Sequence, residues 1–107
     1  MPRVVEVTSA KNPIVRRVRD VAAGEVPGQL LGDGNRLVEE ALDAGLEPVV
    51  AALSDRLFKA RNGRDLRRRL EQRAEQCCHC TDRVMGAMSS MTTPPGVLAV
   101  VRRPASE

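Results

Sequence analysis

The chain has 107 residues, of which 42% are hydrophobic and 29% are charged, and its formal net charge is +3. A chain of this length forms one domain and buries roughly 60–70% of the surface that its unfolded form exposes, which excludes a large cleft between two lobes. It contains no apolar run near the ~18 residues of a membrane span, and its opening residues lack the apolar block of a secretory signal. We therefore expect a soluble protein of the cytoplasm.

The basic side chains are almost all arginine, with 15 Arg against 2 Lys. Arginine carries a planar fork of donors that suits phosphates and guanine edges. Phe58 is the only aromatic residue of the chain, so the stacking platforms of many single-strand binders are missing. Charge and composition alone leave a nucleic-acid partner and an ordinary solvated surface equally open.

The cysteines cluster as Cys77, Cys78 and Cys80 around the only histidine, His79. A zinc site needs pairs separated by two to four residues and a second pair further on, and "CCHC" has neither. In a strand, alternation would bury either Cys78 and Cys80 or Cys77 and His79. We expect no metal and no disulfide framework.

The first predicted helix follows Asn12, a good N-cap, and Pro13, which suits the first helical position. Its apolar stripe consists of Ile14, Val18 and Val21, and Gly24 closes it. Residues 29–34, "QLLGDG", are then expected to form a short strand that ends in glycines.

A second helix is predicted over residues 35–45, where Gly45 occupies a C-cap position. Its expected apolar face consists of Leu37, Val38, Ala41 and Leu42. Residues 46–53, "LEPVVAAL", form a β-rich run that predicts a strand, and Ser54 is expected to cap a short turn or helix, "DRLFK".

The third predicted helix is "GRDLRRRLEQRAEQ", where Leu66, Leu70 and Ala74 recur at intervals of four and charges occupy the other positions. The "CCHC" segment follows as a strand. Thr81 or Asp82 then caps a fourth helix.

In that fourth helix Val84, Met85 and Met88 face inward. Residues 96–101, "GVLAVV", read as a strand buried on both faces. Strands that alternate with helices predict an α/β domain: a three-layer α/β/α sandwich with a mixed, mainly parallel central sheet.

Four segments in this order resemble a known family. "VTSAKNPIVRRVRDV", a strand ending in acidic-Gly, "RLVEEALDAGLEP" and "TTPPGVLAVVRRP" are similar to the N-terminal substrate-binding domain of the SpoU/TrmH-type RNA 2′-O-ribose methyltransferases. The match spans nearly the whole chain. Each piece is weak alone, and the ordered set is specific.

The resemblance implies a fold like that of the small kink-turn-binding ribosomal proteins. In that family the domain delivers RNA to a separate knotted SPOUT domain, which binds S-adenosylmethionine, transfers the methyl group and forms a homodimer. We accordingly expect residues 1–104 to be an RNA-binding domain without cofactor or catalytic residues of its own, and residues 105–107 to begin a linker. On family grounds the expected RNA is ribosomal.

Two positions depart from the family pattern. The family usually has Glu-Gly where this chain has Asp33-Gly34, a change that keeps the charge. It has Thr-Pro-Gln-Gly where this chain has Thr93-Pro94-Pro95-Gly96, so any RNA contact of the family glutamine cannot be transferred to Pro95.

A physical argument for RNA contact starts from the junction after the strand of residues 29–34. Ligands of open α/β sheets gather where strands end, and the amides that open a helix favour phosphate. Gly34, Asn35 and Arg36 occupy this junction, and the loop with Thr92 and Thr93 joins it only by analogy with the family. For the junction, an ordinary glycine turn remains an alternative. For the loop with Thr92 and Thr93, the alternative is a rigid turn that sets strand register.

The arginines divide into two groups. Those of the first helix have only Asp20 nearby, whereas those of the third helix alternate with acids and suggest pairs such as Asp65–Arg69 and Arg67–Glu71. The predicted RNA-binding residues are Lys11, Asn12, Arg16, Arg17, Arg19, Gly34, Asn35, Arg36, Thr92 and Thr93.

No catalytic constellation competes with this interpretation. His79 has no evident partner, and Asp33 has no second carboxylate at a sensible spacing. Two alternatives remain: a free-standing RNA-binding module of a ribonucleoprotein, and a dimerisation domain without RNA affinity.

Overall fold

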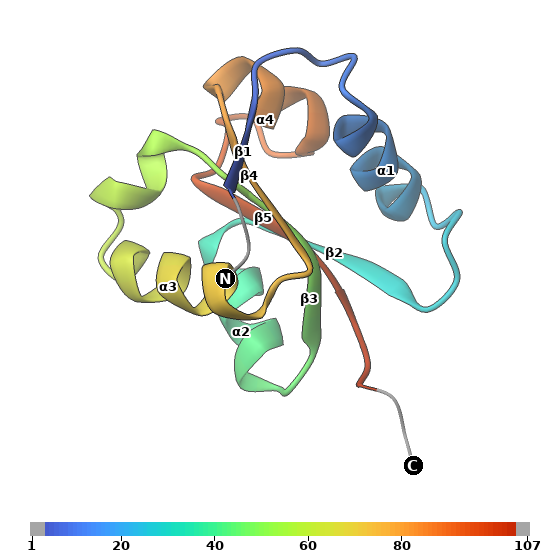
Figure 1. The fold of residues 1–107 in the computed structure, drawn as a ribbon, viewed down its shortest axis with the longest axis vertical. Helices are drawn as coiled ribbons and strands as arrows, with labels where there is room; N and C mark the ends of the chain where they lie inside the picture. The colour runs from blue at the N-terminus through green and yellow to red at the C-terminus, as the bar shows by residue number, and fades with distance from the viewer. Residues whose placement is uncertain (1–3, 105–107) are drawn as a thin grey trace.

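The computed structural model describes residues 4–104, which form a five-stranded sheet with helices on both faces (Figure 1). The strands are β1 (Val4–Val7), β2 (Gln29–Asp33), β3 (Glu47–Leu53), β4 (Gln76–Cys80) and β5 (Val97–Arg102). The helices are α1 (Pro13–Ala22), α2 (Asn35–Asp43), the 3₁₀ helix η1 (Asp55–Lys59), α3 (Gly63–Arg73) and α4 (Asp82–Met88). The predicted α/β class and three-layer arrangement are confirmed.

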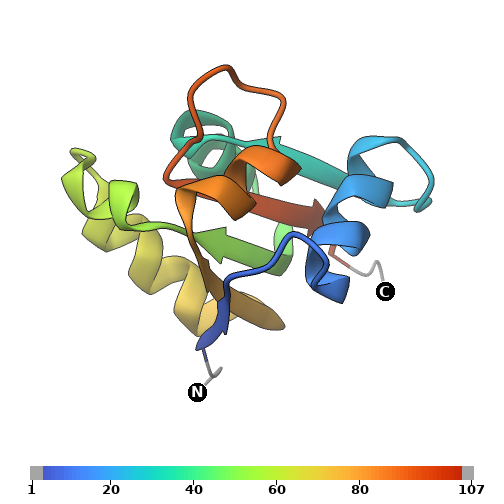
Figure 2. The same cartoon turned by 90° about the horizontal axis from the view of Figure 1, so that it is seen from above.

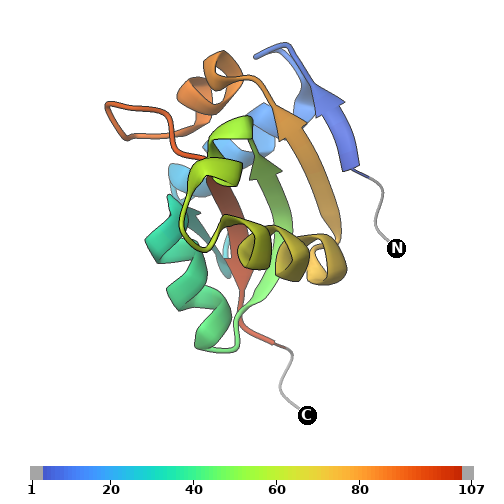
Figure 3. The ribbon, with the colours of Figure 1, turned by 90° about the vertical axis from the view of Figure 1, so that its left-hand side faces the viewer.

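The strands lie in the order β1-β4-β3-β5-β2. Strands β1, β4 and β3 are parallel, and β5 runs antiparallel to both β3 and β2. The strands β1 to β4 therefore all end at one edge of the sheet, where β5 begins (Figure 3). We call this the carboxyl edge; Asp33, opposite Leu98, and Leu53, opposite Val97, lie along it.

Strand β1 was not predicted from the sequence. It has only four residues, Val5 is 42% exposed, and its pairing partner β4 lies about 70 positions away in the chain. An edge strand this short has little local signal, because pairing with a distant strand provides most of its stability.

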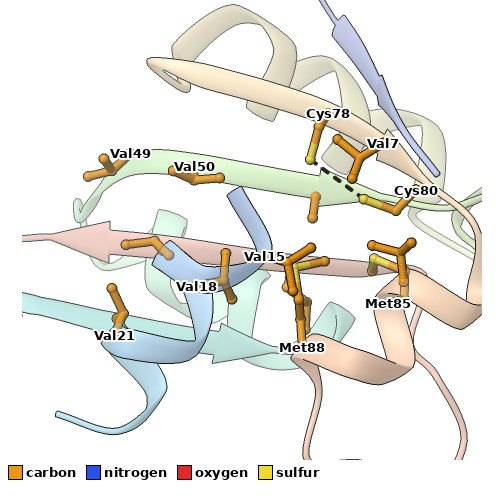
Figure 4. Close-up of a cluster of buried hydrophobic side chains, with 14 residues drawn as sticks. Val7, Val15, Val18, Val21, Val49, Val50, Cys78, Cys80, Met85 and Met88 are labelled. Carbon is orange, nitrogen blue, oxygen red and sulfur yellow. Dashed lines mark hydrogen bonds between the residues drawn. The ribbon is translucent and has the colours of Figure 1, made fainter. Parts of the chain in front are cut away.

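The core has two halves, one on each side of the sheet. Helices α1 and α4 pack on one face through side chains such as Val15, Val18 and Met85 (Figure 4). Helices α2 and α3 cover the other face. Strands β3 and β5 are buried on both sides over almost their whole length, as the apolar run of residues 96–101 predicted.

Two details of the predicted helix faces are wrong. Leu37 is 51% exposed, and α2 instead packs through Val38 and Leu42. On α1 the prediction omitted Val15, the most buried position of the first turn, while Ile14 is half-buried and packs against the same core. Neighbouring apolar residues differ by 100° around a helix, so the pattern alone did not choose between them.

The predicted caps are confirmed for α1 and α4. The Asn12 side chain accepts a hydrogen bond from the Ile14 amide (2.9 Å), and Thr81, rather than Asp82, caps α4 by accepting from the Val84 amide (3.2 Å). Ser54 occupies the N-cap position of η1 as predicted, but its side chain makes no capping hydrogen bond. This buried hydroxyl donates to the Pro95 carbonyl (3.4 Å), because η1 packs against the segment that precedes β5.

The cysteines alternate between faces as predicted, but the expectation that only one of these faces is buried is wrong. Cys78 and Cys80 face the α1 side and Cys77 faces the α3 side, yet all three are buried. Strand β4 lies between β1 and β3 and is covered on both faces, so the cysteine side chains are buried whichever face they point to. Burial raises the pKa of the Cys77 thiol to about 11.

The purified protein is expected to hold no stoichiometric zinc. The thiols of Cys77 and Cys78 lie on opposite faces of the sheet, so the three sulfurs cannot converge on one tetrahedral ion. Metal analysis should return no zinc, and the circular dichroism spectrum should not change in chelator. One zinc per chain would contradict this arrangement.

Candidate nucleic-acid interface

The carboxyl edge brings the amino end of α2 and the loop of residues 89–96 together. Asp33 holds this loop: its carboxylate accepts hydrogen bonds from the Ser89 hydroxyl (2.7 Å), the Ser90 amide (2.8 Å) and the Ser90 hydroxyl (3.1 Å). Figure 2 shows the loop standing out from this edge. The juxtaposition that the family resemblance implied is therefore present in the structure.

Gly34 links the two segments. Its φ of +105° favours glycine, and a Cβ at this position would lie 3.2 Å from the Met91 sulfur. Its amide donates to the Val97 carbonyl (3.1 Å), which ties the start of α2 to the start of β5. Gly34 thus shapes the junction and has no side chain with which to contact RNA.

The first turn of α2 is open to an anion. No side chain caps it and it contains no acidic residue, so its amides lack an intrahelical acceptor and carry the positive end of the helix dipole. The Arg36 side chain is 90% exposed, with Glu40 at 3.4 Å as a weak partner. Asn35 and Arg36 are well placed to meet a phosphate.

Thr92 and Thr93 are exposed in the adjoining loop, whereas Pro95 is buried. The Pro95 carbonyl accepts the hydrogen bond from Ser54. The position at which the family has glutamine therefore serves the packing of the loop in this chain. Asn35, Arg36, Thr92 and Thr93 form one surface around the buried Gly34, and we call these five residues the α2 set.

The remaining predicted residues form a separate group on α1. Lys11, Asn12, Arg16 and Arg19 line a depression of about 600 Å³ that also contains Asp20 and Glu25. Arg17 instead donates a long hydrogen bond to Gln76 (3.4 Å), at the start of β4 and away from the carboxyl edge. Two carboxylates, and not one, thus offset the positive charge of this α1 set, and the Asn12 oxygen is occupied in capping.

The arginines of α3 are largely paired, as predicted, although with partly different partners. Arg67 pairs with Glu71 and lies 4.6 Å from the centroid of the Phe58 ring. Asp65 pairs with Arg68 (2.7 Å) and not with Arg69, which reaches Asp43 on α2 (2.8 Å).

A third basic group was not predicted from the sequence, which placed Arg64 among the self-paired arginines of the third helix and did not single out Lys59 or Arg61. Lys59, Arg61 and Arg64 are exposed around the turn between η1 and α3. The segment "KARNGR" is rich in basic residues, which was a signal in the sequence. The next three arginines are paired with acids, however, and only the tertiary structure distinguishes paired from unpaired arginines.

His79 has two partners, contrary to the sequence prediction. Its Nδ1 lies 3.0 Å from Glu6 Oε1 on β1, and its Nε2 lies 2.8 Å from Asp55 Oδ1 on η1. A neutral imidazole has one N–H, so it cannot donate to two carboxylates. The hydrogen bonds to Asp55 and to Glu6 raise the pKa of His79 above its ordinary value.

This bridge makes stability depend on pH. Because the folded-state pKa of His79 is raised, its contribution is fully present below about pH 6.5, the unfolded pKa, and is lost as pH rises through the folded pKa. We expect the excess stability of the wild type over His79→Gln to shrink between pH 5.5 and 8.5. Both carboxylates are exposed, so the effect stays below about 1 kcal/mol. Urea unfolding at the two pH values measures it, and a gap that widens with pH would refute the bridge.

No protein-family model matches the chain, and no curated protein matches its sequence. Its fold, however, is similar to that of an RNA 2′-O ribose methyltransferase, with a TM-score of 0.72 and 22% identity over 96% of this chain and 39% of that one. The fold is shared with RNA methyltransferases. Two structures of an rRNA methyltransferase from Sinorhizobium meliloti, one with AdoMet bound, are also similar, each with a TM-score of 0.71 and 20% identity over 96% of this chain and 38% of theirs. The chain thus spans about two fifths of the length of these proteins.

No helix within residues 4–104 combines the length and the apolar composition that crossing a membrane requires.

Proposed function

We propose that this chain is the RNA-recognition domain of an S-adenosylmethionine-dependent RNA 2′-O-ribose methyltransferase that acts on ribosomal RNA in the cytoplasm. The observation that carries the proposal is the fold shared with such an enzyme over 96% of this chain and only 39% of that one. The ordered sequence motifs support the same family. The parent enzyme would dimerise through its catalytic domain.

The α2 set supplies the recognition chemistry in this proposal. The uncapped amides of α2 donate hydrogen bonds to a backbone phosphate, and the exposed Arg36 guanidinium adds a second contact. Thr92 and Thr93 offer hydroxyl donors and acceptors from the adjoining loop. Asp33 holds that loop in place, so the surface exists before RNA arrives.

We do not expect residues 4–104 to bind S-adenosylmethionine. Among the strand-to-helix junctions of residues 4–104, only the one after β2 carries glycines, and Met91, Val38 and Ala99 fill the space around them. We therefore expect calorimetric titration of this chain with S-adenosylmethionine to show no binding. We also expect the chain alone not to methylate RNA. Micromolar binding would overturn the proposed division of labour.

The direct test is fluorescence polarisation with a structured fragment of ribosomal RNA. Wild-type protein should bind with an affinity that falls steeply with salt, and Arg36→Gln should weaken binding by about 1–3 kcal/mol if this side chain makes a close phosphate or base contact. Arg68→Gln, whose guanidinium is paired with Asp65, is the matched control and should change affinity little. Absence of any RNA affinity would favour a dimerisation domain.

The gene offers an independent test of the parent enzyme. A SPOUT domain encoded in frame downstream of this segment would support the proposal. A free-standing ribonucleoprotein module would instead lack such a domain while retaining RNA affinity.

A further inference from the structure

We infer that the RNA surface continues from the amino end of α2 onto the turn between η1 and α3, where Lys59, Arg61 and Arg64 contact phosphates. We call these three residues the turn set. The inference rests on the proposed function and replaces the α1 set as the second part of the interface.

The three side chains of the turn set are exposed and form no ion pair within the described part of the chain, although Asp55 and Asp82 share a depression with Lys59. Within residues 4–104, none of them has a carboxylate within 4.0 Å. Their basic neighbours differ: Arg56 pairs with Asp82 at 3.0 Å, and Arg67, Arg68 and Arg69 are all paired. A cation without a partner loses no ion pair when it binds a phosphate, so it contributes more to affinity than a paired one.

The turn lies directly against α2. The Asn62 side-chain amide, within the turn, donates to the carboxylate of Glu39, one helical turn after Arg36. Further along, Arg69 reaches Asp43 at the other end of α2. Figures 1 and 3 show η1 and the start of α3 beside α2 on the same side of the sheet. One strand of RNA backbone can therefore follow the α2 set onto the turn set, past Glu39 and Glu40, whose carboxylates are bound by Asn62 and Arg36.

The turn is also held rigidly. A Cβ at Gly63 would lie 1.7 Å from the Leu57 carbonyl oxygen, and one at Gly96 would lie 2.6 Å from the Leu57 amide nitrogen. Leu57 itself is buried. The backbone that carries the turn set thus packs closely against the start of β5, and less ordering remains to be done on binding.

The α1 set is less suitable on two counts. Helix α1 covers the opposite face of the sheet from α2. Arg17 reaches toward the start of β4, at the far end of the sheet from the α2 set.

The experiment compares two triple variants of equal charge change on the same ribosomal RNA fragment. One is Lys59→Gln/Arg61→Gln/Arg64→Gln, and the other is Arg16→Gln/Arg17→Gln/Arg19→Gln; circular dichroism first confirms that both fold. The turn variant should lose at least about tenfold in affinity and flatten the log–log salt dependence by roughly two to three units, since each phosphate contact contributes about 0.9. The α1 variant should lose less than about threefold.

The outcomes separate this inference from the proposed function. If wild type binds and Arg36→Gln weakens binding while the turn variant does not, the inference is wrong and the proposed function stands. Equal losses in both triple variants would mean diffuse attraction, and a loss confined to the α1 variant would place the interface on α1; either overturns the inference. No binding by wild type would overturn both.

Discussion

Gly63→Ala is expected to destabilise the protein by about 3 kcal/mol, the upper end of the cost of overpacking. The added methyl would lie 1.7 Å from the Leu57 carbonyl oxygen and 2.8 Å from its carbonyl carbon. These are backbone atoms, so no side chain can rotate away, and either η1 or the start of α3 must move. Urea denaturation should show the loss as a lower midpoint.

Gly86→Ala is the matched control for that substitution. The nearest atom to a Cβ at Gly86 is the Pro94 Cγ at 3.6 Å, an ordinary contact, and the residue lies inside α4. Alanine is favoured over glycine within a helix by roughly 0.5–1 kcal/mol, so this variant should be slightly more stable than wild type. Similar effects of the two alanines would show that the close approach at Gly63 is not real.

Asp33→Ala is expected to cost about 2 kcal/mol, as is usual for hydrogen bonds to a charged group. It removes all three bonds that hold Ser89 and Ser90, and with them the anchor of the loop that carries Thr92 and Thr93. We therefore expect lower stability in urea and faster proteolysis between residues 90 and 95. RNA affinity should fall as well, because the loop is then no longer ordered before binding.

Asp43→Ala provides the comparison for this second substitution. It also removes one carboxylate, but Asp43 is 63% exposed and its single partner is Arg69, so the cost should stay below about 1 kcal/mol. Asp33→Glu, which restores the residue type of the resembled family, should keep part of the anchor. Equal stability of Asp33→Ala and Asp43→Ala would refute the anchoring role.

Several elements followed from local sequence signals. Asn12 and Pro13 start α1 as predicted, and Gly45, with a φ of +85°, ends α2 directly after its C-cap residue Ala44. The apolar run of β5 predicted a strand buried on both faces, and the β-rich run of β3 predicted a strand; both strands are present and buried. In each case the structure depends on residues within a few positions of one another or on a continuous apolar run, and both can be recognised in the sequence.

The candidate interface depended on the sequence only in part. The junction at Gly34 could be identified from its glycines and the helix that follows, and the paired nature of the α3 arginines from their alternation with acids. That Asp33 ties this junction to Ser89 and Ser90, more than 50 residues away, could not be derived from spacing.

By itself, the sequence determined the α/β class, most of the helices and strands and the composition of the core, because these depend on periodicity, caps and turn residues. Only the tertiary structure decided strand β1, the two carboxylate partners of His79 and the exposure of Leu37. It also decided which arginines are paired and which face of the sheet each basic group occupies. The physical reason is that an ion pair or an edge strand forms between segments brought together by the sheet, and sequence spacing does not record which distant residue will lie opposite.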